Sequence, residues 1–231
     1  MNFFDELTDD FRVFTYKVAY DAGTAPNPFH GLCTLAICKP AIRRVAKAGD
    51  IIVGLGCGDS GNRIVYCMRV SRKVLWEKYI SGCYSDEFPR NKIPKHERDQ
   101  GDCIWRQTIS LHKPLDSWSH HENCDFQRDI KDGLNVLIAH EFWYFGKGDK
   151  FDLRLPKELF QMIPGRGHKS NANEHYKEQF IAHLKEALSR HNIKTFGIYG
   201  SPALSPFEAD EKSCSSCRTK ERESDSAQED Q

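Results

Sequence analysis

The segment 51–70 constrains the fold most, because a glycine-rich stretch lies between two strand-like runs. The string GCGDSG at 56–61 satisfies G-x-G-x-x-G after the apolar run 51–55. In dinucleotide-binding folds such a loop is followed by a helix whose N-terminus faces the ligand. Here the run 63–70 (RIVYCMRV) follows, and its residues alternate as they do in a strand. The sequence therefore predicts a β-hairpin with a glycine-rich turn, and not a cofactor-binding loop.

The other patterns predict an α+β fold. Strands are expected at 11–20, 32–38, 134–145 and 195–199, and helices at 40–48, 74–80, 156–163 and 174–191. The last helix is amphipathic, because Phe180, Leu184 and Leu188 fall on one face. Asn171 with Glu174 resembles a capping pair. The strands gather early and the long helix comes late, so we expect a mixed or antiparallel sheet in place of a regular α/β alternation.

Charge is distributed unevenly along the chain. The chain has 231 residues, with 33 basic and 33 acidic side chains. Residues 207–231 hold eight acids, four bases and almost nothing apolar, so we expect a disordered acidic tail. Residues 1–206, with 29 bases and 25 acids, then form a single, mildly basic domain. The neutral total therefore does not exclude a nucleic-acid partner.

Cysteine usage and the N-terminus favour the cytoplasm. The nine cysteines are an odd number, and the first residues carry acids and no basic segment. No apolar run approaches the roughly 20 residues of a membrane span, so no membrane partner is expected. His112, His120, His121 and Cys124 offer donor atoms for zinc, but their spacing matches no standard site. We therefore expect no metal and no cofactor.

A more specific signal is the segment 25–44, which reads APNPFHGLCTLAICKPAIRR. Together with YKVAYDAG at 16–23, GDCI at 101–104 and FWYFG at 142–146, it resembles the nucleotide modification-associated domain family 2. The resemblance covers about residues 12–200 and implies a place among systems that modify nucleic-acid bases. It implies no established catalytic residue.

A second, shorter resemblance concerns the hairpin at 49–73. It is similar to the corresponding hairpin of PUA-like barrels, including the EVE and ASCH groups. Those barrels bind nucleic acid and often hold a base in a pocket. This resemblance implies that the α+β fold contains a PUA-like β-barrel with short helices.

The residues suited to binding a nucleotide are basic, aromatic or carboxamide side chains. Bases neutralise phosphates, aromatic rings stack on nucleobases, and a carboxamide in a rigid loop reads a base edge. The candidates are Asn27, Phe29, Lys39, Arg43, Arg44, Arg63, Trp105 and Tyr144. Trp143 and Tyr144 point to opposite faces of their strand, so at most one of them can stack. A solvated basic face and a structural turn at Asn27 are the alternatives.

Two further residues are candidates for general acid–base chemistry, namely Asp102 and His121. Histidine titrates near neutral pH, and a carboxylate can orient it. His121 lies in the stretch 82–132, which shows little periodicity, and a loop of that length is often functional.

The leading hypothesis is a nucleic-acid- or nucleotide-binding domain that acts in base modification or defence. Its partner would be DNA, RNA or a nucleotide, received in a pocket edged by Asn27, an aromatic residue and the stretch 82–132. The second hypothesis is an enzyme that modifies a nucleotide base with Asp102 and His121. The third is a protein-interaction module. The acidic tail could also occupy the basic face as an autoinhibitory contact.

Overall fold

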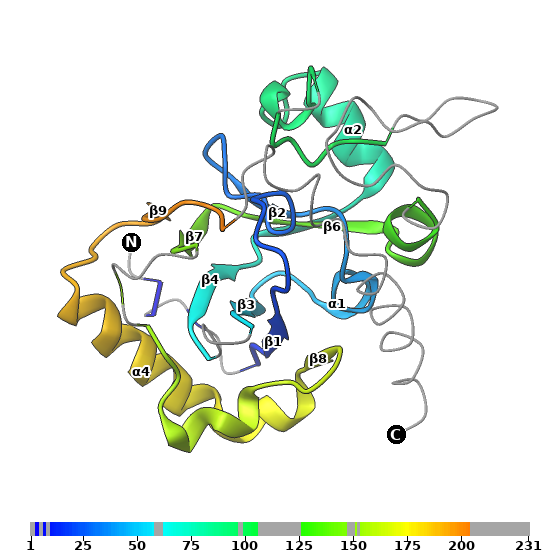
Figure 1. Ribbon diagram of the computed structural model, residues 1–231. Coiled ribbons are helices and arrows are strands. Elements are labelled where there is room, and N and C mark those ends of the chain that lie inside the picture. The colour runs from blue at the N-terminus through cyan, green and yellow to red at the C-terminus, as the bar shows by residue number, and fades with distance from the viewer. Residues whose placement is uncertain are drawn as a thin grey trace.

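A computed structural model describes residues 3–4, 7, 10–57, 62–96, 99–105, 126–146, 151 and 153–203 (Figure 1). These residues form an α+β fold with a six-stranded sheet and a three-stranded sheet, which confirms the predicted fold class. Within this part of the chain, every helix is too short or too polar to cross a bilayer.

The elements follow one another in a mixed order. The strands are β1 (Val13–Lys17), β2 (Cys33–Leu35), β3 (Ile51–Leu55), β4 (Ile64–Arg69), β5 (Arg72–Leu75), β6 (Asn135–Ala139), β7 (Glu141–Tyr144), β8 (His168–Lys169) and β9 (Gly197–Ile198). The α-helices are α1 (Pro40–Val45), α2 (Trp76–Tyr84) and α4 (Lys177–Arg190). Shorter helical segments are η2 (Arg90–Lys92), η3 (Gln127–Asp132), η4 (Lys157–Met162) and η5 (Asn171–Tyr176). Segment η3 is a π-helix and the other three are 3₁₀-helices.

A long two-stranded ribbon belongs to both sheets. Strands β4 and β5 pair with β7 and β6 in one continuous antiparallel register, from Tyr66 opposite Tyr144 to Leu75 opposite Asn135. The β4–β7 half lies within the six-stranded sheet, whose order is β8-β1-β3-β4-β7-β9. The β5–β6 half pairs with β2 in the smaller sheet. The pairs β1–β3 and β7–β9 are parallel, so the larger sheet is mixed, as expected.

The strands do not close into a barrel, so the PUA-like closure implied by the hairpin is not found in the described part of the chain. Strands β8 and β9 are the edges of the larger sheet, and β2 and β5 are the edges of the smaller one. Strand β2 has only three residues. Pro26 and Pro28 in the loop before it lack the N–H groups that a strand ladder needs.

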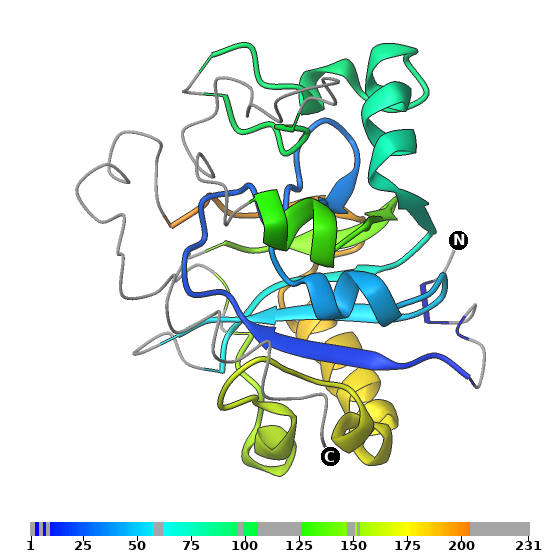
Figure 2. The same cartoon turned by 90° about the vertical axis from the view of Figure 1, so that its right-hand side faces the viewer.

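The core is layered around the two sheets. Helix α4 covers one face of the six-stranded sheet, where Phe180 and Leu184 pack on Val53 and Trp143. The opposite face packs against α1 and the smaller sheet, and α2 covers the far face of that smaller sheet. Figures 1 and 2 show α4 and α2 at opposite ends of the molecule. Successive residues of one strand therefore enter different cores.

The predicted hairpin at 51–70 is confirmed as the antiparallel pair β3–β4, although residues 58–61 of its turn lie outside the described residues. Three other expectations are corrected. The strand expected at 134–145 is interrupted at His140, whose N–H donates to the Ser71 hydroxyl at 3.1 Å. Helix α2 begins at Trp76, not at 74, because the two preceding residues pair with β6.

The start of the last helix is the third correction. Residues 171–176 form the 3₁₀ segment η5, and α4 begins at Lys177. Neither segment has a side-chain cap, so the capping pair expected at Asn171 and Glu174 is wrong.

Candidate functional site

Three tyrosines stand in one row across the six-stranded sheet. The strand registers place Tyr16, Gly54, Tyr66 and Tyr144 beside one another on β1, β3, β4 and β7. A Cβ at Gly54 would lie 2.4 Å from an atom of the Tyr66 ring, so this ring needs the space that glycine leaves. The Tyr66 hydroxyl donates to the Tyr16 hydroxyl at 2.9 Å. All three tyrosines are buried. We call them the tyrosine row.

The tyrosine row ends at Asp21, the first residue of the loop 21–31. The Tyr144 hydroxyl donates to Asp21 Oδ1 at 2.5 Å. Asp21 is only 6% exposed, and its Oδ2 has no hydrogen-bond partner in the described structure. Burial raises the pKa of Asp21 to about 6, although hydrogen bonds from Tyr144 and from the backbone of Ala203 and Gly23 act to lower it. The loop therefore presents a buried, half-satisfied carboxyl group.

Burial also raises the pKa of each phenol in the tyrosine row. The phenols are therefore protonated at neutral pH and act as hydrogen-bond donors. At the other end of the row, Lys39 Nζ lies 5.3 Å from the centre of the Tyr16 ring. Cys38 and Lys39 both have left-handed backbones, with φ of 57° and 44°. Such non-glycine conformations cost about 1–3 kcal/mol each and are concentrated at functional sites.

A second buried network holds the middle of the loop 21–31. Lys92 Nζ donates to Asn27 Oδ1 at 2.6 Å, to the carbonyl oxygens of Asn27 and Leu32, and to Thr34 Oγ1 at 3.1 Å. The Asn27 amide donates to the carbonyl oxygens of Gly23 and Gln100. Asn27 is fully buried and both ends of its carboxamide are occupied. The structure thus places Asn27 as an anchor of the loop.

Asp102 belongs to the same network. Its carboxylate accepts hydrogen bonds from the hydroxyl groups of Thr34 and of Tyr79, the latter at 2.6 Å. Burial raises the pKa of Asp102, and the charge of Lys92 acts against this rise. Burial likewise lowers the pKa of Lys92, which Asp102 opposes. Asp102 has no exposed surface, and His121, its predicted partner, lies outside the described residues.

Arg43 and Trp105 lie together in a third buried cluster. The Arg43 guanidinium donates to four carbonyl oxygens, those of Ala36, Cys38, Asp129 and Asn135. Burial lowers the pKa of Arg43 to about 10. The Asp129 carboxylate accepts the Trp105 indole N–H at 3.2 Å. Arg43 is fully buried, so its guanidinium offers no surface to a phosphate in this conformation.

The other predicted ligand residues differ in their exposure. Phe29 is half-buried, and its ring would lie 2.8 Å from a Cβ at Gly23, so it packs on the loop 21–31. Lys39 is half-buried and Arg44 is exposed. Arg63 is mostly buried and its backbone bridges to Arg154, away from the loop.

The structure therefore brings Asn27 together with Asp102, and joins Tyr144 to the same loop through Asp21. The sequence reasoning missed Asp21 and Lys92. Asp21 lies within the segment 16–23 that carries the family resemblance, which is a signal that could have found it. No local pattern marks Lys92. Among the described residues, no three His, Cys, Asp or Glu side chains are grouped closely enough to hold a metal, and the zinc-donor candidates lie outside them.

The fold and the site can be compared with known proteins. No curated protein and no solved structure matches this chain. The family described as nucleotide modification associated domain 2 matches residues 10–208, which is most of the chain and contains both networks beneath the loop 21–31. The match agrees with the resemblance found in the segment 25–44. The chain therefore belongs to the nucleotide modification associated domain 2 family.

Proposed function

We propose that this member of the family is a nucleotide- or nucleic-acid-binding domain, acting in base modification or defence, and that the loop 21–31 contacts the base. The observation that carries the proposal is Asp21 Oδ2. This acceptor is buried and has no partner in the described structure, beside a loop that is fixed at Asn27. An unsatisfied buried acceptor costs about 1–3 kcal/mol, which a ligand donor would recover once the start of the loop 21–31 opens to admit it.

Nucleobases carry the donor that this site lacks. Their amino and ring N–H groups lie on the edges that proteins read. Phe29, half-buried on the same loop, offers a ring on which a base can stack. Lys39 immediately precedes α1 and Arg44 lies within it, and both carry the positive charge that binding a phosphate requires.

The test is binding of single- and double-stranded DNA, of RNA and of free nucleosides to the wild type and to Asp21→Asn. Tyr144 donates to Oδ1, so the amide nitrogen of the variant takes the place of Oδ2 and turns an acceptor into a donor. We expect affinity to fall about 5- to 150-fold, which corresponds to the loss of about 1–3 kcal/mol for the acceptor. Asp86→Asn, at an exposed position, is the matched control and should bind normally. Equal binding by wild type and Asp21→Asn would contradict the assignment of Asp21.

The enzyme alternative receives less support from the geometry. Asp102 accepts two hydrogen bonds, has no exposed surface and feels the positive charge of Lys92, which are the properties of a structural carboxylate. A reaction at Asp102 would require the site to open. Mass spectrometry of nucleosides from treated DNA and RNA tests this alternative, since a base-modifying enzyme must change their masses and Asp102→Asn must abolish the change.

A further inference from the structure

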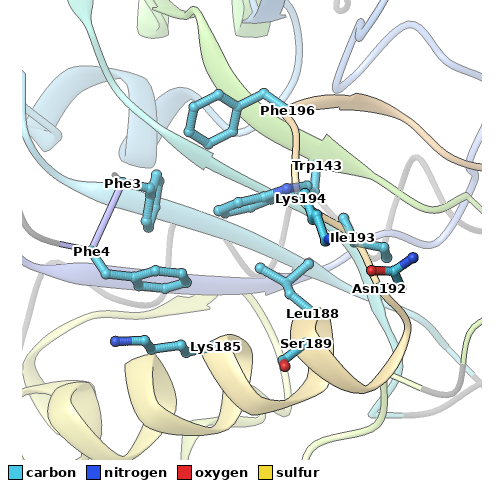
Figure 3. Close-up of a pocket in the computed structure, with 10 residues that line it drawn as sticks. All are labelled: Phe3, Phe4, Trp143, Lys185, Leu188, Ser189, Asn192, Ile193, Lys194 and Phe196. Atoms are coloured by element: carbon cyan, nitrogen blue, oxygen red, sulfur yellow. The ribbon is translucent and has the colours of Figure 1, made fainter. Parts of the chain in front are cut away.

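A hollow of about 300 Å³ opens on the face of the six-stranded sheet that α4 covers (Figure 3). It lies between β7, the C-terminal turn of α4, and the aromatic pair Phe3 and Phe4. Its floor includes Trp143, whose neighbour Tyr144 points to the opposite face and belongs to the tyrosine row. The hollow is therefore separated from the loop 21–31 by the sheet itself.

The walls of the hollow are aromatic. The rings of Phe4 and Trp143 are close to parallel, at 18° with centroids 6.1 Å apart. Phe3 and Phe196 meet the same indole at 4.8 Å and 5.0 Å. The Trp143 indole N–H donates to the Thr195 carbonyl oxygen at 2.9 Å, which fixes the orientation of the ring. Phe3 and Trp143 are almost fully buried, so the flat apolar surface that a planar ligand can reach is that of the half-buried Phe4 and Phe196.

The rim of the hollow is cationic. Lys185 and Lys194 both line it, both are exposed, and no acidic residue is among the described residues that line it. Lys185 Nζ lies 5.8 Å from the centre of the Phe4 ring. The end of α4 by itself disfavours an anion, although the carbonyl oxygens of Ala187, Leu188 and Ser189 accept N–H groups from residues 191–193. Among the described residues that line the hollow, the two lysines are therefore the charged ones.

We propose that this hollow binds a flat aromatic anion of the size of a nucleoside monophosphate. The base lies against the aromatic walls, and the phosphate lies between Lys185 and Lys194. The volume of about 300 Å³ is at the lower end for small-molecule sites, which suits one nucleotide unit. This site goes beyond the proposed function, because it lies on the other face of the sheet from Asp21.

The experiment is calorimetric titration of the full chain with adenosine and thymidine 5′-monophosphates. Lys185→Glu combined with Lys194→Glu should weaken binding at least about tenfold, with an unchanged melting temperature. Phe4→Ala should weaken it as well. Lys78→Glu, an exposed charge reversal on α2, is the matched control and should bind as the wild type does.

Further titrations distinguish the contribution of the base from that of the phosphate, and a free nucleotide from the end of a nucleic-acid strand. Adenosine and inorganic phosphate should each bind at least about tenfold more weakly than the monophosphate, since each keeps only half of the contacts. A 5′-phosphorylated trinucleotide is compared with the monophosphates. Tighter binding of the trinucleotide would show that the hollow binds the end of a nucleic-acid strand. Tighter binding of the monophosphates would show that it binds a free nucleotide. The proposal is overturned if neither the monophosphates nor the trinucleotide shows saturable binding at millimolar concentration. It is also overturned by binding that survives the double lysine variant but is lost in Asp21→Asn, which would place the nucleotide at the loop 21–31 instead.

Discussion

Burial of the Asp21 carboxyl group lowers the stability of the folded protein at neutral pH. The pKa of this group rises from 3.8 to about 6. Below about pH 4 the group is protonated in both the folded and the unfolded chain, so it has no net effect. Between about pH 4 and pH 6 the unfolded chain releases this proton while the folded chain retains it, so stability is lost, and above about pH 6 the folded state holds a buried charge. At neutral pH the cost approaches about 3 kcal/mol, at 1.36 kcal/mol per pKa unit.

Asp21→Asn is therefore expected to stabilise the protein in a pH-dependent way. The difference in free energy of unfolding between variant and wild type should grow by up to about 3 kcal/mol between pH 4 and pH 7, because only the wild type acquires the charge. Urea unfolding at both pH values measures it. A difference that stays constant with pH would show that Asp21 titrates normally.

The second prediction concerns the contribution of the buried Lys92 to stability. Lys92→Met leaves the Asp102 carboxylate buried without its cation and Asn27 Oδ1 without a donor. We expect a loss of about 3–5 kcal/mol in the free energy of unfolding. Adding Asp102→Asn should recover part of this loss, because no charge is then left unpaired. Lys95→Met, at an exposed position, is the control and should change stability by less than about 0.5 kcal/mol. Wild-type stability in Lys92→Met would refute the role of the network.

These residues also show how far the sequence could predict the site. Residue type predicts Asn27 as a base-reading group and Asp102 as an acid–base group, and the structure joins the two in one buried network without testing either role. The connection runs through Lys92, and a lysine in a polar, proline-bounded stretch is normally exposed. Only tertiary packing decides that it is buried, so no local pattern could identify it.

At the scale of elements, an apolar run, a glycine-rich turn and an alternating run predict the central hairpin, and both of its strands are buried on both faces. Predictions failed where a partner far away in the sequence decides the structure. Val74 and Leu75 were expected to be helical but pair with β6. Strand β8 has only two residues, which is too short for a periodic pattern, and the sequence does not predict it. Strand β9 is equally short but falls within the strand expected at 195–199.

Substitution of Gly54 in β3 tests how tightly the tyrosine row, which crosses four strands, is packed. Gly54→Ala would bring a Cβ within 2.4 Å of the Tyr66 ring and 2.6 Å of a Val18 methyl group. Overpacking of this kind costs about 1–3 kcal/mol, so we expect a loss of that size in chemical denaturation. Gly165→Ala is the control, because a Cβ there meets nothing within 4 Å. A neutral Gly54→Ala would mean that the Tyr66 ring has other space to occupy.

At the scale of the whole molecule, the separation of charge along the chain leads to a prediction about the acidic tail. Residues 207–231 carry a net charge of −4 and residues 1–206 a net charge of +4. If the tail competes for the basic surface, truncation after residue 206 should tighten nucleic-acid binding at low salt. The gain should vanish at high salt, where such contacts are screened. A full-length variant with amides in place of the eight tail acids should behave like the truncation. Unchanged affinity in both would contradict competition by the tail.

The ribbon formed by β4–β5 and β6–β7 has a consequence for how the molecule opens. Its amides lie in both sheets, and its side chains enter all three apolar clusters. Neither sheet can therefore detach as an independent unit without breaking the ladder that the other shares. We expect the amide hydrogens of Tyr66 and Leu137 to exchange with solvent deuterium only by global unfolding, at one common free energy. Two different opening energies for the two halves of the ribbon would instead divide the fold into separate cooperative units.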